Sequence, residues 1–182
     1  MTASNHLLKR LGGGDRRSIG RSNDVAELVF RRPVLFAELI HGMCAADPLV
    51  RMRAADAAEK VSLKQPDLLK PCKTELLRLL EEAQEQELRW HLAQMVPRLP
   101  LTSKERSRAA TILRSYLQDA SSIVKTCAMQ ALADLAARDE SLHHETRALL
   151  QDAVRNGTAA MKARARKLLA RSKPTHKTGV LS

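Results

Sequence analysis

Four basic residues recur at nearly equal spacing along the chain. Each follows an apolar residue; they are Arg51, Arg89, Lys125 and Lys162, separated by 38, 36 and 37 residues. If each occupies the same place in a repeated unit, the four side chains follow one edge about 10 Å apart, the usual spacing of packed helices. Such a ladder could bind a polyanion, or it could bind carboxylates and carbonyls of the neighbouring repeat. Trp90 is a further contact candidate, because an amphipathic ring beside cations is common at interfaces; it could also fill a gap between repeats.

The C-terminal part of the chain is strongly basic. From residue 155 onward there are eight basic side chains and no carboxylate. The candidate polyanion site comprises Arg155, Lys162, Arg164, Arg166, Lys167, Arg171 and Lys173. A cluster of this kind attracts phosphate backbones by counterion release; it could equally be the polar cap that closes a repeat protein. Only 2% of residues are aromatic, which disfavours stacking on unpaired bases and favours duplex DNA or structured RNA.

Other patterns that could carry chemistry are incomplete. The run from Gly12 to Gly14 lacks the following Lys-Ser/Thr of a P-loop. His143 and His144 point to different faces of a helix, so the sequence His-His-Glu is not expected to bind a metal. No Ser/His/Asp or Cys/His constellation is recognisable. We therefore expect no enzyme activity, no catalytic residue, no metal and no cofactor.

Apolar spacing and capping residues predict helices throughout. Residues 1–22 are expected to form a flexible basic arm containing several glycines, and residues 24–31 a short capping helix. Four helical hairpins follow in a repeat domain over residues 23–171, at about 33–62, 66–99, 102–137 and 141–171. Their second helices are expected to begin after capping residues such as Asp47 and Ser121, and Ser141 is expected to cap the first helix of the last hairpin. Residues 172–182 are expected to be a disordered basic tail.

A period near 37 residues built from two helices is typical of an α-solenoid. The segments LIHGMCAADPLVRMRAADAAEKV, LLKPCKTELLRLLEEA and ELRWHLAQMVPRL resemble the HEAT-repeat family. The resemblance covers residues 33–171 and implies an all-α fold, a short right-handed α-solenoid of about four hairpins. The family's inter-repeat Asp–Arg ladder is not expected in the last two repeats, where Lys125 and Lys162 replace arginine. HEAT-like alkylpurine DNA glycosylases use several tryptophans, whereas Trp90 is the only one in this chain.

Composition agrees with a helical chain and suggests its surroundings. The 182 residues include seven Gly and seven Pro and carry a net charge of +11. Residues 34–100 carry only −1, so the positive excess lies near the two ends. No stretch of eighteen apolar residues is present, so we expect a soluble protein with no membrane association. Three widely separated cysteines, Cys44, Cys72 and Cys127, suit reduced thiols in a helical core and a cytoplasmic location.

These patterns favour a non-catalytic HEAT-like scaffold that binds a protein partner. The alternative is a module that binds duplex DNA or structured RNA through the basic C-terminal helix and the N-terminal arm. A HEAT-like enzyme is a second alternative.

Overall fold

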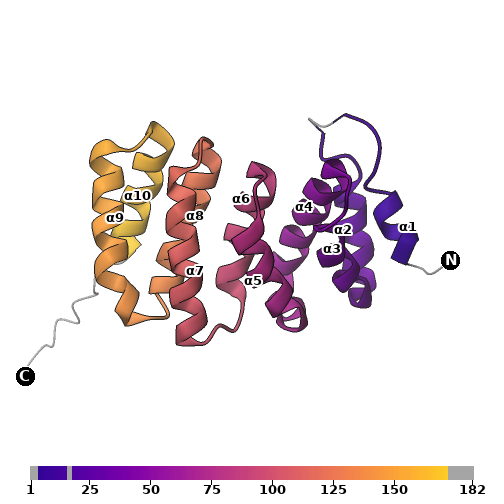
Figure 1. Ribbon diagram of the computed structural model, residues 1–182, viewed down its shortest axis with the longest axis horizontal. Helices are drawn as coiled ribbons and strands as arrows, with labels where there is room; N and C mark the ends of the chain where they lie inside the picture. Colours follow the sequence, from indigo (N-terminus) through magenta and orange to yellow (C-terminus); the bar gives the residue numbers. More distant parts are fainter. Residues whose placement is uncertain (1–3, 16–17, 172–182) are drawn as a thin grey trace, which may run out of the picture.

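The structure, a computed structural model, describes residues 4–15 and 18–171. Ten α-helices and five short 3₁₀ turns make up their regular secondary structure, and no strand occurs within these ranges. The expected all-α fold is confirmed. Figure 1 shows the pairs of helices following one another along the long axis, with α1 at one end and α9 and α10 at the other.

The bounds of the elements follow the capping and helix-breaking residues of the sequence. The α-helices are α1 (Ser4–Lys9), α2 (Ser22–Arg31), α3 (Phe36–Gly42), α4 (Pro48–Lys64), α5 (Lys73–Glu82), α6 (Gln86–Met95), α7 (Ser103–Ser115), α8 (Ser122–Ala136), α9 (His143–Asn156) and α10 (Ala159–Arg171). The 3₁₀ turns are η1 (Pro33–Leu35), η2 (Pro66–Cys72), η3 (Val96–Arg98), η4 (Tyr116–Gln118) and η5 (Glu140–Leu142).

Side-chain caps fix several helix starts. Asp47 accepts a 2.9 Å hydrogen bond from the Leu49 amide at the start of α4, and Thr102 forms a reciprocal capping box with Glu105 at the start of α7. The expectation for Ser141 was wrong. Asp139 instead caps the preceding turn η5 and accepts hydrogen bonds from both the amide and the hydroxyl of Ser141.

The helices pair into four hairpins, α3–α4, α5–α6, α7–α8 and α9–α10. The second helices α4, α6, α8 and α10 also pack directly on one another in this order, which forms a continuous layer. Small buried residues allow their close approach: Ala54, Ala57, Ala58, Ala93, Ala128, Ala131 and Ala165. A largely aliphatic core runs from Leu7 to Leu142. A smaller cluster, which includes Leu150 and Leu168, holds the last hairpin.

The N-terminal segment is packed on the domain, so the expectation of a flexible arm over residues 1–22 was wrong for its described part. Leu7 and Leu11 are buried, and α1 contacts α3. Arg53 of α4 is 2% exposed and donates hydrogen bonds to the carbonyls of Leu11, Gly13, Asp15 and Ser18, at 2.6–3.1 Å. Sequence reasoning missed this anchor. The predicted tail, residues 172–182, lies outside the described residues.

Two further predictions from the sequence concern membrane association and the burial of the cysteines. Among the described residues, no helix is both long enough and apolar enough to cross a membrane. The core assignment was wrong for Cys44, which is exposed, whereas Cys72 and Cys127 are partly buried and pack against the core. Cys44 follows the end of α3 and contacts Glu75, with Sγ and Oε1 3.1 Å apart.

Candidate functional site

The first member of the predicted ladder, Arg51, binds the next hairpin. Its guanidinium forms an ion pair with Glu85, the residue before α6, and one of the hydrogen bonds measures 3.1 Å. Its Nη1 also donates to the carbonyls of Ala45 and Ala46, at 2.6 and 2.9 Å. These partners belong to the end of its own hairpin turn and the start of the next second helix. Arg51 therefore fastens two hairpins together.

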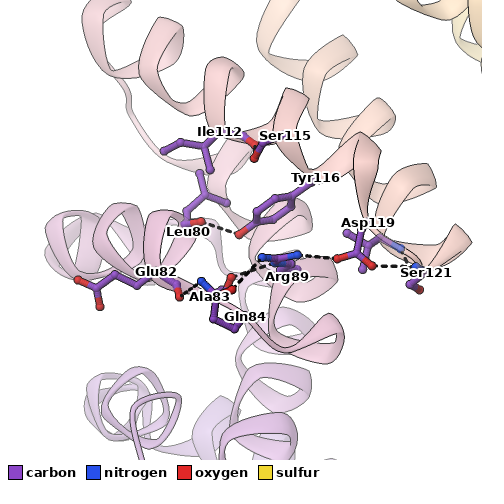
Figure 2. A network of polar contacts seen from close by, with 11 residues as sticks. Leu80, Glu82, Ala83, Gln84, Arg89, Ile112, Ser115, Tyr116, Asp119 and Ser121 are labelled. Carbon is purple, nitrogen blue, oxygen red and sulfur yellow. Dashed lines mark hydrogen bonds and ion pairs between the residues drawn. The ribbon is translucent and has the colours of Figure 1, made fainter.

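Arg89 repeats this arrangement one hairpin later (Figure 2). Its Nη1 lies 2.7 Å from Asp119 Oδ2, and its Nε donates to the Ala83 carbonyl at 2.9 Å. The guanidinium also lies over the Tyr116 ring, with Cζ 5.1 Å from the ring centroid. Tyr116 in turn donates its hydroxyl proton to the Leu80 carbonyl at 2.5 Å. The network ties α5, α6 and η4 into one joint.

The surroundings of Asp119 favour its charged form. Burial alone would raise its pKa, but the hydrogen bond from the Ser121 amide and the bond from Arg89 outweigh burial and hold the pKa below its ordinary value. Burial also raises the pKa of Tyr116, so its hydroxyl stays a hydrogen-bond donor. The joint therefore contains a true ion pair and a neutral phenol.

The last two residues of the predicted ladder do not repeat the ion pairs of Arg51 and Arg89. Lys125 and Lys162 are half-buried, and neither forms an ion pair within the described residues. The four ladder cations are therefore not one set of free charges. Trp90 is half-buried, and its ring centroid lies 5.6 Å from that of His91. His91 itself is buried, and its Nδ1 has no hydrogen-bond partner in the described part of the chain.

The basic C-terminal helix presents most of its cations to solvent. Arg155, at the end of α9, and Arg164, Arg166, Lys167 and Arg171 on α10 are exposed. Three of these five touch α8 or α9: Arg164 donates to Gln130 Oε1 at 3.0 Å, Arg171 lies 3.6 Å from Asp134, and Arg155 lies 3.8 Å from Asp152.

The remaining cations of this helix have fewer local contacts. Lys162, Arg166 and Lys167 form no ion pair with any described residue. Lys162 and Arg166 are four residues apart on one side of α10, whereas Lys167 and Arg171 form an equivalent pair on another side. Lys173 lies outside the described residues.

A feature that sequence reasoning missed lies at the C-terminal ends of the second helices. A groove of about 440 Å³ is lined by residues of α4, α6, α8 and α10 and of the segments that follow α6 and α8. Its lining residues are Leu63, Ala93, Gln94, Pro97, Arg98, Gln130, Asp134, Ala137, Arg138 and Arg171. We call it the inner groove. The one large apolar side chain in this lining that is strongly exposed is Leu63, at 64%.

A pocket of about 570 Å³ adjoins the inner groove, because Ala137 and Arg171 line both. Leu150 and Leu168 are lining residues but are only 2% and 3% exposed, and the N-terminal turns of α9 contribute polar side chains. Its full lining is Ala133, Ala136, Ala137, His143, His144, Thr146, Arg147, Leu150, Leu168 and Arg171. We call it the end pocket.

The sequence does contain a pattern that marks the region of the inner groove and the end pocket. This pattern lies at the C-terminal ends of the second helices and not at their starts. A basic residue stands at or just after each of the four C-terminal ends: Lys64, Arg98, Arg138 and Arg171. Cations are favoured there because the helix dipole places partial negative charge at that end. Lys64 lies over the Phe30 ring, with Nζ 4.8 Å from its centroid, and Arg98 pairs with Glu59 at 2.5 Å.

The described residues contain no group of three or more His, Cys, Asp or Glu side chains placed to hold a metal ion. Comparison with known proteins gives no assignment: no protein-family model matches the chain, and no curated protein matches it significantly.

Proposed function

We propose that this chain is a short HEAT-like α-solenoid that acts as a non-catalytic scaffold and binds a protein partner on its second-helix layer. The observation that carries the proposal is the inner groove, which follows the C-terminal ends of this layer, together with the end pocket beside it, to which α9 also contributes. Clefts that combine apolar surface with a few placed polar groups are the usual sites of recognition.

The solenoid part of the proposal is supported by the repetition of one joint. Arg51 with Glu85 and Arg89 with Asp119 make equivalent contacts between successive hairpins. In a solenoid each repeat buries its apolar face only against its neighbours, and such joints set the angle between repeats. These two arginines already have partners inside the chain, so recognition is assigned to other residues of the layer.

Site-specific photo-crosslinking tests the scaffold proposal. A photoreactive residue at Thr126, on the second helix α8, is compared with one at exposed Ser107, on the first helix α7. We expect a discrete protein adduct in cell extract from position 126 and none from position 107. Adducts of equal strength from both positions, or from position 107 alone, would contradict binding on the second-helix layer.

Nucleic-acid binding is a second candidate, favoured by the exposed cations Arg166 and Lys167 that form no ion pair with described residues. Titration with a DNA duplex at two salt concentrations tests it. If four phosphates are contacted, a fourfold rise in salt should weaken binding roughly 100-fold. The double variant R166E/K167E should abolish binding, whereas R108E, on the exposed face of α7, should not. Binding that does not depend on salt would exclude this candidate.

A further inference from the structure

Resting on the proposed scaffold function, we propose that the inner groove and the end pocket together bind an extended acidic segment of a partner protein, with one large apolar side chain inserted in the end pocket. The two cavities are neighbours, because Ala137 and Arg171 line both. One ligand can therefore occupy both cavities. The end pocket determines one part of the ligand's chemistry, and the inner groove determines the other.

The end pocket selects the apolar anchor. Three alanines line it together with Leu150 and Leu168, which belong to the core cluster of the last hairpin and are 2% and 3% exposed. Its volume of about 570 Å³ lies within the usual range for ligand sites. A leucine, isoleucine or phenylalanine placed there would remove apolar surface from water on both partners.

Charge selects the rest of the segment. Four arginines line the two cavities, Arg98, Arg138, Arg147 and Arg171, and Asp134 is the single carboxylate among the lining residues. The Arg138 side chain is exposed, and among the described residues it donates only to the Pro97 carbonyl, at 3.0 Å. Neither Arg138 nor Arg147 forms an ion pair within the described part of the chain. Both therefore have guanidinium donors for carboxylates, which arginine binds in a planar, bidentate manner.

Two other occupants fit less well. A nucleic-acid backbone supplies phosphates for the arginines but has no aliphatic group for the end pocket. The chain's own residues 172–182 follow Arg171 in sequence but contain Lys173 and Lys177 and no Asp or Glu. Placing this basic segment along four arginines would bring like charges together, which is unfavourable.

Selection from a displayed library of random peptides tests the proposal. Peptides of about 12 residues are used because an extended chain of that length spans the four second helices. We expect enriched peptides to contain several Asp or Glu residues beside one Leu, Ile or Phe. A synthetic peptide of the enriched sequence should lose binding when its acids become Lys, and should weaken about tenfold or more when the apolar anchor becomes Ala.

Variants of the protein locate the peptide. R138E should weaken binding of the acidic peptide about tenfold or more, whereas K104E, an equal charge change at an exposed site on α7, should leave it within about twofold. A137F places a large side chain at an exposed residue that lines both cavities and should also weaken binding. Circular dichroism and thermal unfolding of each variant confirm that the fold is intact.

Several results would overturn the inference. These are enrichment of basic or uncharged peptides, no enrichment at all, or equal binding by R138E and the unchanged protein. Binding that becomes detectable only after deletion of residues 172–182 would identify the chain's own tail as the occupant. A protein adduct from Thr126 alongside any of these results would leave the scaffold function standing, so the two proposals fail separately.

Discussion

Arg89 and Asp119 are 30 residues apart and belong to successive hairpins, yet their side chains meet at 2.7 Å. Asp119 is almost fully buried, with 4% of its side chain exposed, and it also receives the Ser121 amide before α8. One carboxylate thus organises the turn between α7 and α8 and joins that turn to α6. Arg51 and Glu85 stand in the same relation one hairpin earlier.

Replacement of Asp119 by Asn should destabilise the protein by about 2 kcal/mol, because the half-buried Arg89 guanidinium loses its anionic partner. Urea unfolding monitored by circular dichroism measures the change. The matched control is D152N, since Asp152 is 60% exposed and lies 3.8 Å from Arg155. That variant should change stability by no more than about 0.5 kcal/mol. Equal effects of the two variants would show that the Arg89–Asp119 pair contributes nothing beyond a surface pair.

Arg53 should hold the N-terminal segment in place. Methionine at this position fits the buried stem but removes the donors to four carbonyls, so R53M should destabilise the protein by about 3 kcal/mol. Hydrogen exchange should show loss of protection at the amides of Leu11 and Ser22, which bond to Leu8 and Ile19 carbonyls. R53K should behave similarly, because one ammonium cannot replace a guanidinium fork. Unchanged exchange at these amides would contradict the anchoring role.

Helix positions and starts could be predicted because they depend on local residues. Asp47 before Pro48 and Thr102 before Glu105 carry their capping chemistry within four residues. Arg53 could not be assigned in this way. It stands among alanines on a buried helix stripe, and its partners are main-chain carbonyls more than thirty residues away, which leave no pattern in side-chain types.

The inner groove and end pocket were missed for a related reason. Their lining residues come from all four hairpins, so no single segment contains them. The sequence assigned no role to Arg138 and predicted Arg171 only as part of the candidate polyanion site. Only the packing of α8 against α10 brings both to the inner groove.

Gly42 lies where α1 and α4 both approach α3. A Cβ at this position would stand 2.5 Å from Leu8 Cδ2 and 3.0 Å from Ala54 Cβ. The higher helix propensity of alanine is worth about 1 kcal/mol, but overpacking costs about 1–3 kcal/mol. G42A should therefore be destabilised by about 1 kcal/mol in thermal or urea unfolding.

The contact with Leu8 can be isolated with a double-mutant cycle. In an L8A background one of the two close contacts is absent, so G42A should cost less there than in the unchanged chain. Additive effects of the two substitutions would mean that Leu8 does not pack on Gly42. A larger cost in the L8A background would have the same meaning.

Acid should weaken the fold through carboxylates whose pKa values are lowered by neighbouring cations. The hydrogen bond from Arg78 lowers the pKa of Glu75 from 4.5 to about 2, and that from Lys73 lowers the pKa of Glu105 from 4.5 to about 2. Folding therefore favours the charged forms. Their contribution to stability is complete above the ordinary pKa of 4.5 and is lost as the pH falls towards about 2.

The urea midpoint should accordingly stay nearly constant from neutral pH to about pH 5 and should fall between pH 4.5 and pH 2. E105Q keeps a hydrogen-bonding side chain at the start of α7 but cannot titrate, so its midpoint should fall less steeply over this interval. T74Q places the same amide at an exposed position of α5 and should leave the acid dependence unchanged. If E105Q and the unchanged chain lose stability in parallel, the Lys73–Glu105 pair does not contribute to acid unfolding, and other carboxylates must account for it.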